Sequence, residues 1–220
     1  MRKLLLLRPE PGLSQSAKRA GDLGLEVIAC PLFRVEPIAW DAPDLSDYDA
    51  SLLTSANAVR AAGPGLESLR ELPVYAIGAA TAEAAQQAGF NIAAVGESDI
   101  EQLLAAIPGS QRLLHLAGEN RREVDSAHRI DRITVYRAAA IDSPGLPRLD
   151  GLVAAVHSPR AGARLGQLAA DRARTAIAAI SAAAAEACGP GWERIEVAAT
   201  PDDESLLAVA AMLCHTSPRK

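Results

Sequence analysis

The heptapeptide "LLTSANA", residues 52–58, has a counterpart in "AVHSPRA", residues 155–161, and the spacing of the two decides the fold. Ser55 and Ser158 occupy the same position in the two stretches, 103 residues apart. Two more ungapped alignments have this spacing: "VYAIGAATAEAA" with "IAAISAAAAEAC", and Asp99-x-Glu101-x-Leu103-Leu104 with Asp202-x-Glu204-x-Leu206-Leu207. One alanine-rich match is weak evidence, but three matches at one spacing are not. The chain is therefore predicted to contain an internal duplication.

Length and composition fit two small α/β domains. A chain of 220 residues is longer than one typical core requires. Apolar residues make up 49% of it, whereas aromatic residues make up only 3%. The core must therefore be built from Ala, Leu, Val and Ile, with helices packed closely through alanine.

Short apolar runs alternate with alanine-rich segments of helix length, which is the order expected of parallel strands covered by helices on both faces. The predicted strands are residues 3–7, 26–29, 51–54, 74–77, 92–95, 112–116, 152–156, 176–180 and 195–198. Ser14 and Gly24 are predicted to begin and end the first helix, and Gly89 to end a later one. The sequence thus predicts an α/β protein of two flavodoxin-like, parallel-sheet domains.

The spacing of 103 residues also aligns "FRVEPI", residues 33–38, with "YRAAAI", residues 136–141. Both segments lie where one half ends and the other begins, so they are predicted connectors between domains, and ligands bind preferentially between domains. Phe33 lacks the hydroxyl of its counterpart Tyr136, which indicates a polar role for Tyr136. The competing interpretation is an aromatic side chain that packs at a junction while its hydroxyl meets water.

Charge and cysteine content exclude several classes of protein. The net charge is −5 with no run of Lys or Arg, so we expect no nucleic acid partner. This charge does not exclude binding of a small anionic ligand. Cys30, Cys188 and Cys214 share no metal-ligand spacing, which indicates no metal, three unpaired thiols and a reducing, cytoplasmic compartment. The first leucine run ends at Arg8 and is too short for a signal peptide or a membrane span.

Five turns after predicted strands carry small or hydroxyl-bearing residues. The N–H groups at a helix N-terminus can bind carboxylates there, and parallel sheets bind ligands beyond the carboxyl ends of their strands. Each turn taken alone is also explained as an ordinary helix cap. The candidate substrate-binding residues at these turns are Thr54, Ser55, Ala56, Asn57, Gly78, Thr81, Gly118, Ser158 and Ser181.

A set of motifs covers nearly the whole chain in the order "LLLLRPEP", "LLTSANAV", "VYAIGAATAEAAQQAG", "LLHLAGENRRE", "ITVYRA", "VHSPRAG" and "ATPDDESLL". No single motif is specific, but together they resemble the uroporphyrinogen-III synthase family. The resemblance implies two α/β domains joined by a two-stranded linker. Carried onto this sequence, it gives residues 1–33 with 142–220 as one domain, 41–133 as the other, and 34–40 with 134–141 as the linker.

The family's reaction, in haem biosynthesis, closes hydroxymethylbilane, a linear tetrapyrrole with eight carboxylates, while inverting its last pyrrole ring and losing water. The resemblance therefore implies a monomeric lyase without cofactor or metal. It assigns Tyr136 as the general acid at the departing hydroxyl, a role that a phenol of ordinary pKa about 10 can fill weakly near neutral pH. It also favours Arg8, which follows the first strand, as a carboxylate-binding residue.

Other polar and aromatic residues are predicted to have structural roles. His115 lies inside an apolar strand, so a buried, hydrogen-bonded side chain is expected. Trp40 and Trp192 are expected to pack. The remaining arginines near strand ends are expected to be solvated surface charges: Arg121, Arg122, Arg137 and Arg160.

The chain departs from the family pattern in two places. Ser181 is followed by Ala182, Ala183 and Ala184 where polar residues are usual, so only backbone donors are expected beyond the serine. The interval from Gly118 to Tyr136 is short for a full helix plus a strand.

Two alternatives come from other classes of protein. A hinged binding or sensor protein for a small anionic ligand would have the same two halves. Tyr136 at the connector favours an enzyme instead, and the lack of a secretion signal argues against a transport protein. A nucleotide or flavin protein would need a glycine-rich phosphate loop, and none of the required spacing is present.

Overall fold

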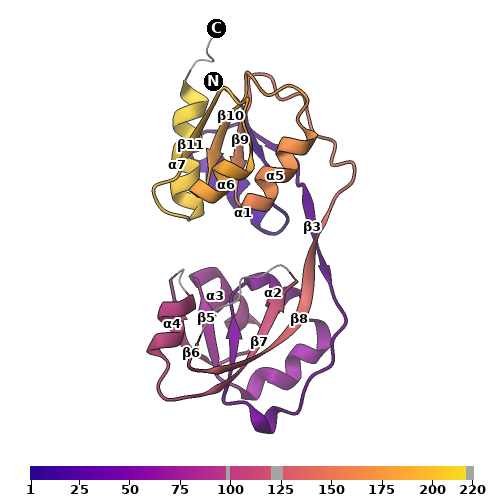
Figure 1. Ribbon diagram of the computed structural model, residues 1–220, viewed down its shortest axis with the longest axis vertical. Helices are drawn as coiled ribbons and strands as arrows, with labels where there is room; N and C mark the ends of the chain where they lie inside the picture. The colour runs from indigo at the N-terminus through magenta and orange to yellow at the C-terminus, as the bar shows by residue number, and fades with distance from the viewer. Residues whose placement is uncertain (98–99, 120–125, 217–220) are drawn as a thin grey trace. The chain divides into compact units, whose positions relative to one another are not determined.

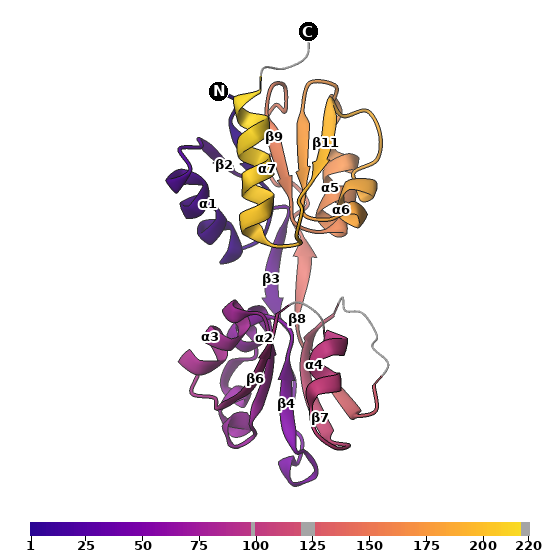
Figure 2. The same ribbon diagram turned by 90° about the vertical axis from the view of Figure 1, so that its left-hand side faces the viewer.

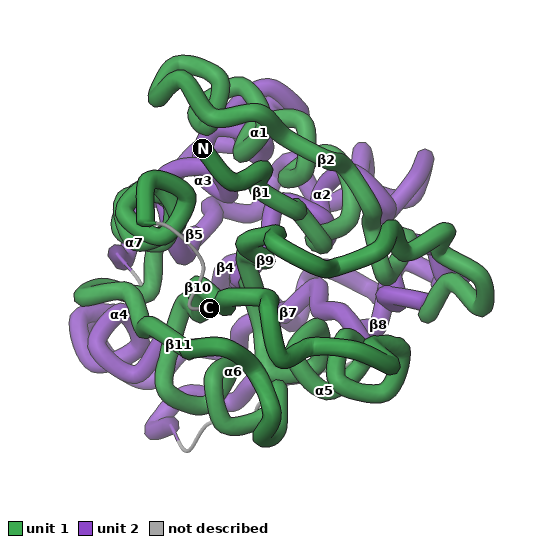
Figure 3. Tube along the Cα trace, turned by 90° about the horizontal axis from the view of Figure 1, so that it is seen from above, with its two compact units in different colours: residues 1–34, 140–220 green, residues 35–139 purple. Residues whose placement is uncertain are grey.

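The computed structural model describes residues 1–97, 100–119 and 126–216. The chain divides into two compact units, residues 1–34 with 140–220 (unit 1) and residues 35–139 (unit 2), which Figure 3 colours separately. Figure 1 labels the elements. The strands are β1 Leu4–Leu6, β2 Val27–Ala29, β3 Phe33–Pro37, β4 Ala50–Leu53, β5 Val74–Ile77, β6 Ile92–Gly96, β7 Arg112–Gly118, β8 Arg129–Ala140, β9 Val153–Val156, β10 Ala176–Ala179 and β11 Arg194–Val197. The helices are α1 Gly12–Asp22, α2 Ala56–Ala61, α3 Ala79–Gln87, α4 Ile100–Ala106, α5 Pro159–Leu168, α6 Ala182–Ala187 and α7 Asp203–His215, with 3₁₀ turns at Leu45–Asp47 and Gly63–Glu71.

Unit 1 is a parallel sheet with the strand order β11-β10-β9-β1-β2. Numbered along this unit, the order is that of flavodoxin, with the central strand β1 paired with β9 from the far end of the chain. Alternate residues of β1, β9 and β10 face α1 and α7 in one core cluster, and Figure 1 shows α5 on the opposite side of the sheet. Every residue of these three strands is buried, as a sheet with both faces covered requires.

Helices α5 and α6 pack closely through small residues, in keeping with the low aromatic content of the chain. A Cβ added at Gly162 would lie 2.7 Å from the carbonyl oxygen of Ala184, and one added at Gly166 would lie 2.8 Å from that of Cys188. Such a close backbone approach is open only to residues without a side chain. Small residues therefore bring these helices together, as the composition predicted.

Unit 2 has the sheet order β3-β8-β7-β4-β5-β6. Strands β4 to β8 pair in parallel, whereas β3 runs opposite to β8, because Ile38 N donates to Val135 O and Ile141 N donates to Leu32 O. One core cluster joins α2, α3 and the Gly63–Glu71 turn to one face. A second cluster joins α4 to the other face, an arrangement visible in Figure 2.

The internal duplication is evident in the positions of the helices. Helices α2, α3 and α4 begin at Ala56, Ala79 and Ile100, and α5, α6 and α7 begin 103 residues later, at Pro159, Ala182 and Asp203. Strand β7 takes the place that β1 has in unit 1, and β8 the place of β2. Leu113 pairs with Ile130 where Leu4 pairs with Val27, so this connection is six residues shorter in unit 2. Part of it, residues 120–125, lies outside the described residues.

All nine predicted strands are present, with ends within two residues of the prediction. The helix start predicted at Ser14 was wrong: α1 begins at Gly12 after Pro11, and Ser14 lies in the first turn, where its N–H and hydroxyl donate to the Glu10 carboxylate at 3.1 and 2.8 Å. Glu10 thus supplies the carboxylate that a capping side chain would otherwise provide. The division into two units has no separate linker, so the linker of residues 34–40 and 134–141 stays a prediction.

Candidate functional site

The turn after β4 uses both of its hydroxyls within the protein. Thr54 Oγ1 is hydrogen-bonded to His115 Nε2 at 3.0 Å. Ser55 caps α2, since its side chain accepts a hydrogen bond from Asn57 N at 3.2 Å. His115 is 4% exposed, so the prediction of a buried, hydrogen-bonded histidine is confirmed. A ligand at this turn would therefore meet the backbone of Ala56 more readily than the two hydroxyls or the N–H of Asn57, all of which already have partners.

The turn after β5 depends on the backbone of a glycine. Gly78 has a φ of 80°, in the left-handed region, and its N–H donates to Gly96 O at 2.7 Å. Its carbonyl accepts from Thr81 N at 3.1 Å, and the Thr81 side chain is buried. This turn therefore offers a ligand the first backbone groups of α3, at Ala79 and Ala80, and little of the Thr81 hydroxyl.

Gly118 and Tyr136 lie directly against each other. Gly118 is the last residue of β7, and it pairs with Tyr136 of β8 in the sheet. A Cβ added at Gly118 would lie 2.6 Å from Tyr136 Cζ and 2.8 Å from Tyr136 Oη. The tyrosine ring therefore covers the glycine at the carboxyl end of β7. The structure thus brings together these two predicted residues, which come from different strands.

In unit 1, Ser158 and Ser181 are helix caps. Ser158 Oγ accepts a hydrogen bond from Ala161 N at 3.2 Å, and Ser181 Oγ accepts one from Ala184 N at 3.3 Å. Because each hydroxyl satisfies an N–H of the first helical turn, it adds stability to α5 or α6. The alanines after Ser181 begin α6 and contribute only backbone.

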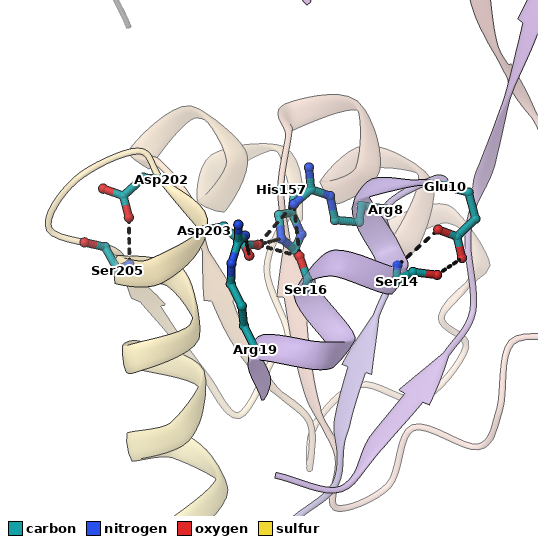
Figure 4. A network of polar contacts seen from close by, with 9 residues as sticks. All are labelled: Arg8, Glu10, Ser14, Ser16, Arg19, His157, Asp202, Asp203 and Ser205. Atoms are coloured by element: carbon teal, nitrogen blue, oxygen red, sulfur yellow. Dashed lines mark hydrogen bonds and ion pairs between the residues drawn. The ribbon is translucent and has the colours of Figure 1, made fainter. Parts of the chain in front are cut away.

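Arg8 is held in a network of charged and polar side chains, shown in Figure 4. Its Nη1 donates to Ser16 Oγ at 3.0 Å and to Asp203 Oδ1 at 3.1 Å. Asp203 also accepts from Ser16 Oγ at 2.6 Å, from Arg19 Nη1 at 2.7 Å and from His157 Nε2 at 2.8 Å. The arginine is thus oriented by its neighbours, and its side chain is 29% exposed.

Burial and hydrogen bonding act in opposite directions on these groups. Burial raises the pKa of Asp203, but the hydrogen bonds from His157, Ser16 and Arg19 outweigh it, so that pKa lies well below its ordinary value. Burial lowers the pKa of His157, against the pull of Asp203. The lowered pKa of Asp203 favours an ionised carboxylate, and the lowered pKa of His157 favours a neutral imidazole. A neutral imidazole can donate from Nε2 to that carboxylate. With Arg8 and Arg19 charged, the network carries a net positive charge.

The network lies at the point of the sheet where the strand order reverses. Arg8 follows β1 and His157 follows β9, and these two strands are neighbours. In flavodoxin-like sheets this switch point is where ligands bind, beyond the carboxyl ends of the strands. Ser158, at the start of α5, immediately follows His157.

A family comparison bears on most of the chain. The model of the family described as "Uroporphyrinogen-III synthase HemD" matches residues 14–208. This chain belongs to the uroporphyrinogen-III synthase family. Its members act on a tetrapyrrole in haem biosynthesis.

Solved structures of uroporphyrinogen-III synthases share the fold. The enzyme from Helicobacter pylori 26695 is 18% identical, with 97% of this chain and 100% of that chain covered and a TM-score of 0.67. A selenomethionine derivative of a mutant enzyme from Thermus thermophilus is 19% identical, with 96% and 98% covered and a TM-score of 0.54. The predicted α/β fold with an internal duplication is confirmed.

A cavity of about 570 Å³ lies against α1 and α7 in this uroporphyrinogen-III synthase homologue, next to the Arg8 network, with which it shares Arg19 and Asp203. Among the described residues that line it, Arg19 is the only cation, and the carboxylates of Asp22, Asp202, Asp203 and Glu204 surround it. An excess of carboxylates repels a polycarboxylate such as a tetrapyrrole. The cavity is therefore a poor site for the family's substrate.

Sequence reasoning missed His157 and Asp203, although the duplication held a signal for both. At a spacing of 103 residues, His157 corresponds to Thr54 and Asp203 to Ile100. A polar or charged residue in one half, opposite a different residue in the other, marks a role confined to that half. The same comparison had singled out Tyr136 opposite Phe33.

The remaining predicted residues lie apart from these contacts. Arg137 pairs with Glu36 at 2.9 Å, and Arg160 stacks on the Phe33 ring at 4.7 Å. Trp40 and Trp192 pack, with their indole N–H groups donating to Ala62 O and Cys188 O. Arg121 and Arg122 lie outside the described residues. Among residues 1–97, 100–119 and 126–216, no helix is long and apolar enough to cross a membrane.

Proposed function

We propose that this protein converts hydroxymethylbilane into uroporphyrinogen III, as a lyase that closes the macrocycle with inversion of the last pyrrole ring and loss of water. The family match over residues 14–208 carries this proposal. The placement of Tyr136 against Gly118, at the carboxyl end of a central strand, supports it at the level of residues.

The substrate's carboxylates are bound by strand-end turns in each unit. Ala56, Ala79 and Ala80 offer N–H groups at the starts of α2 and α3, whereas Asn57 N already donates to Ser55 Oγ. The network around Arg8 offers a positive charge at the start of α1. Fixed dipoles and a pre-oriented guanidinium hold anionic groups without further rearrangement. The other predicted residues of these turns fix the course of the backbone and so the position of its N–H groups. They are Thr54, Ser55, Gly78, Thr81, Ser158 and Ser181.

The chemical step begins at the hydroxyl of the substrate's first ring. Tyr136 Oη donates a proton to this hydroxyl as the bond to carbon breaks, so that water leaves and a cation-like pyrrole remains. The last ring then attacks this carbon through the ring carbon that already carries its methylene link to the third ring. That link breaks and re-forms at the free α-carbon of the last ring, which inverts the ring, and the proton lost from this α-carbon restores the phenol. The reaction involves no net oxidation or reduction, so it requires no redox cofactor, and the proposal includes neither a metal nor a second subunit.

Other properties follow from the same proposal. The three cysteines are buried free thiols, which is consistent with a reducing, cytoplasmic setting. The main task of the protein is geometric, since hydroxymethylbilane also closes spontaneously without inversion. A flexible substrate must be folded and its cation kept from water.

The test supplies freshly prepared hydroxymethylbilane and identifies the product isomer by chromatography after oxidation to porphyrin. We expect isomer III at a rate proportional to protein concentration, with isomer I from the protein-free control. Isomer I alone, formed at the rate of the protein-free control, would contradict the proposal.

Replacement of Tyr136 by Phe tests the proton donor. The change removes one oxygen atom and keeps the ring that covers Gly118. We expect the rate of isomer III formation to fall about 10–100-fold, at or below the lower end of the usual range for a general acid, because substrate folding is unaffected. Steady-state rates and isomer ratios are the measurement, with Tyr75→Phe in β5 as the matched control. Full activity of Tyr136→Phe would remove Tyr136 from the proposed role.

A further inference from the structure

The pairing of β7 with β8 contains an irregularity at Tyr136. From Arg112 opposite Arg129 to Ala117 opposite Thr134, the two parallel strands advance together, one residue at a time. Gly118 should then face Val135, but it faces Tyr136. One residue of β8 is therefore extra at this point, which is a bulge. Bulges are uncommon between parallel strands, and they re-aim a side chain where they occur near functional sites.

The bulge is anchored on both sides. The Val135 side chain is fully buried in the core cluster that joins β8 to α2 and α3. After the bulge, Glu119 N donates to Tyr136 O at 2.9 Å. The backbone of Tyr136 is therefore fixed by a buried neighbour and by a hydrogen bond to the residue that follows β7. What remains to be fixed is the direction of its ring.

Gly118 provides the surface on which this ring lies. The positions of Tyr136 Cζ and Oη, 2.6 and 2.8 Å from a Cβ built on Gly118, are closer than real Cβ atoms approach other atoms. Gly118 is not among the glycines with positive φ. Its backbone conformation therefore suits any residue, and only the ring of Tyr136 requires a glycine here.

The corresponding aromatic residue in unit 1 is held differently. Phe33 is covered by the guanidinium of Arg160, 4.7 Å from the ring centroid, and the residue that corresponds to Arg160 in unit 2 is Asn57. The contact of a tyrosine with a bare glycine is therefore specific to unit 2. It occurs in the unit where the aromatic residue carries a hydroxyl.

We propose that Gly118 is a positioning residue that acts through Tyr136: the bulge brings the tyrosine over β7, and the missing side chain leaves room there for the hydroxyl end of its ring, which fixes the place of the phenolic oxygen. This inference rests on the proposed function of Tyr136 as proton donor. It differs from the earlier prediction that Gly118 contacts substrate directly, since the glycine now affects catalysis only as far as the tyrosine does.

Gly118→Ala forces the ring away, and the first test needs no activity. The chain has three tyrosines, so ring-¹³C tyrosine gives a simple NMR spectrum, in which the signals of Tyr136 are those lost in Tyr136→Phe. We expect Gly118→Ala to shift the Tyr136 signals and to leave those of Tyr48 and Tyr75 in place. Unchanged Tyr136 signals would overturn the inference. Gly21→Ala, where a Cβ meets nothing within 4 Å, is the matched control for the same substitution.

The second test is a double-mutant cycle on isomer III formation. We expect Gly118→Ala to lower kcat by about tenfold or more with a smaller change in KM, because misplacing a catalytic group by about 1 Å costs up to about 10²-fold. In a Tyr136→Phe background, Gly118→Ala should cost less than about twofold, because no hydroxyl is left to misplace. An equal loss in both backgrounds would overturn the inference in favour of a direct contact with substrate. A fully active Tyr136→Phe would instead contradict the proposed function, and the NMR result would still stand.

Discussion

Replacement of Arg2 by Met should destabilise unit 1 by about 3–5 kcal/mol, the usual cost of removing one partner from a buried ion pair. The Arg2 and Glu193 side chains are 5% and 4% exposed and approach to 2.9 Å. The guanidinium also donates to Gly151 O, Leu152 O and Arg174 O, at 3.0, 2.7 and 3.1 Å. Methionine would take the guanidinium away from the buried carboxylate of Glu193 and from these three carbonyl groups.

The two tryptophans allow this loss to be assigned to one unit. Trp192 lies in unit 1 and Trp40 in unit 2, so urea unfolding of Arg2→Met in a Trp40→Phe background reports unit 1 through fluorescence. The double variant Arg2→Met/Glu193→Leu, which removes both charges, should recover much of the loss. If Arg2→Met unfolds at the urea concentration of its parent, the buried pair contributes nothing and the prediction is wrong.

Asp203→Asn should be the second costly change, because it removes the charge that accepts hydrogen bonds from Arg8 and from three side chains near it. The Asp203 side chain is 13% exposed, and two arginines would be left facing each other. We expect a loss of about 1.5–3 kcal/mol at pH 7, the range for hydrogen bonds to a charged group. Urea unfolding followed by Trp192 fluorescence measures it.

The pH dependence follows from the lowered pKa of Asp203, in which the effect of burial is outweighed by the hydrogen bonds it accepts. Because the pKa is lower in the folded than in the unfolded protein, the stabilisation is complete above the ordinary aspartate pKa of about 3.9. It is lost as the pH falls toward the folded value, by at most about 1.4 kcal/mol per pH unit. The difference between the parent and Asp203→Asn should therefore be constant from pH 7 to 5 and shrink below about pH 4.

Glu204→Gln is the matched control, since Glu204 is the next acidic residue in the same turn of α7 and is exposed. Its effect should stay within about 0.5 kcal/mol, as for most surface substitutions. An equal effect of the two substitutions would indicate a general helix-dipole contribution in place of the Asp203 network.

The sequence predicted the central strands well because they are buried on both faces, and such strands are continuous apolar runs, as in "LLLL" after Lys3 and "VAAV" at β9. The start of α1 was misplaced because the carboxylate of Glu10, before the helix, takes the place of a capping residue. The long extent of β8, Arg129–Ala140, could not be derived from its alanines. Its length depends on pairing with β3 and β7, which is a tertiary effect.

At the candidate site, the predicted turns lie where strand order places them, at the ends of β4, β5, β7, β9 and β10. What the sequence could not provide is which polar groups already have partners. Thr54 is engaged by His115, Ser158 and Ser181 by helix N–H groups, and Arg8 by Asp203. Thr54 with His115 and Arg8 with Asp203 are far apart in the chain, so these contacts are known only once the strands are in register.

The discontinuous make-up of unit 1 has a consequence during protein synthesis. Residues 35–139 form unit 2 without interruption, so this unit can fold while the ribosome is still producing the rest of the chain. The central strand β1 is made first, but its neighbour β9 begins only at Val153. Until then the leucines of β1 lack one of their partners, and they are the part of the nascent chain that a chaperone would be expected to protect.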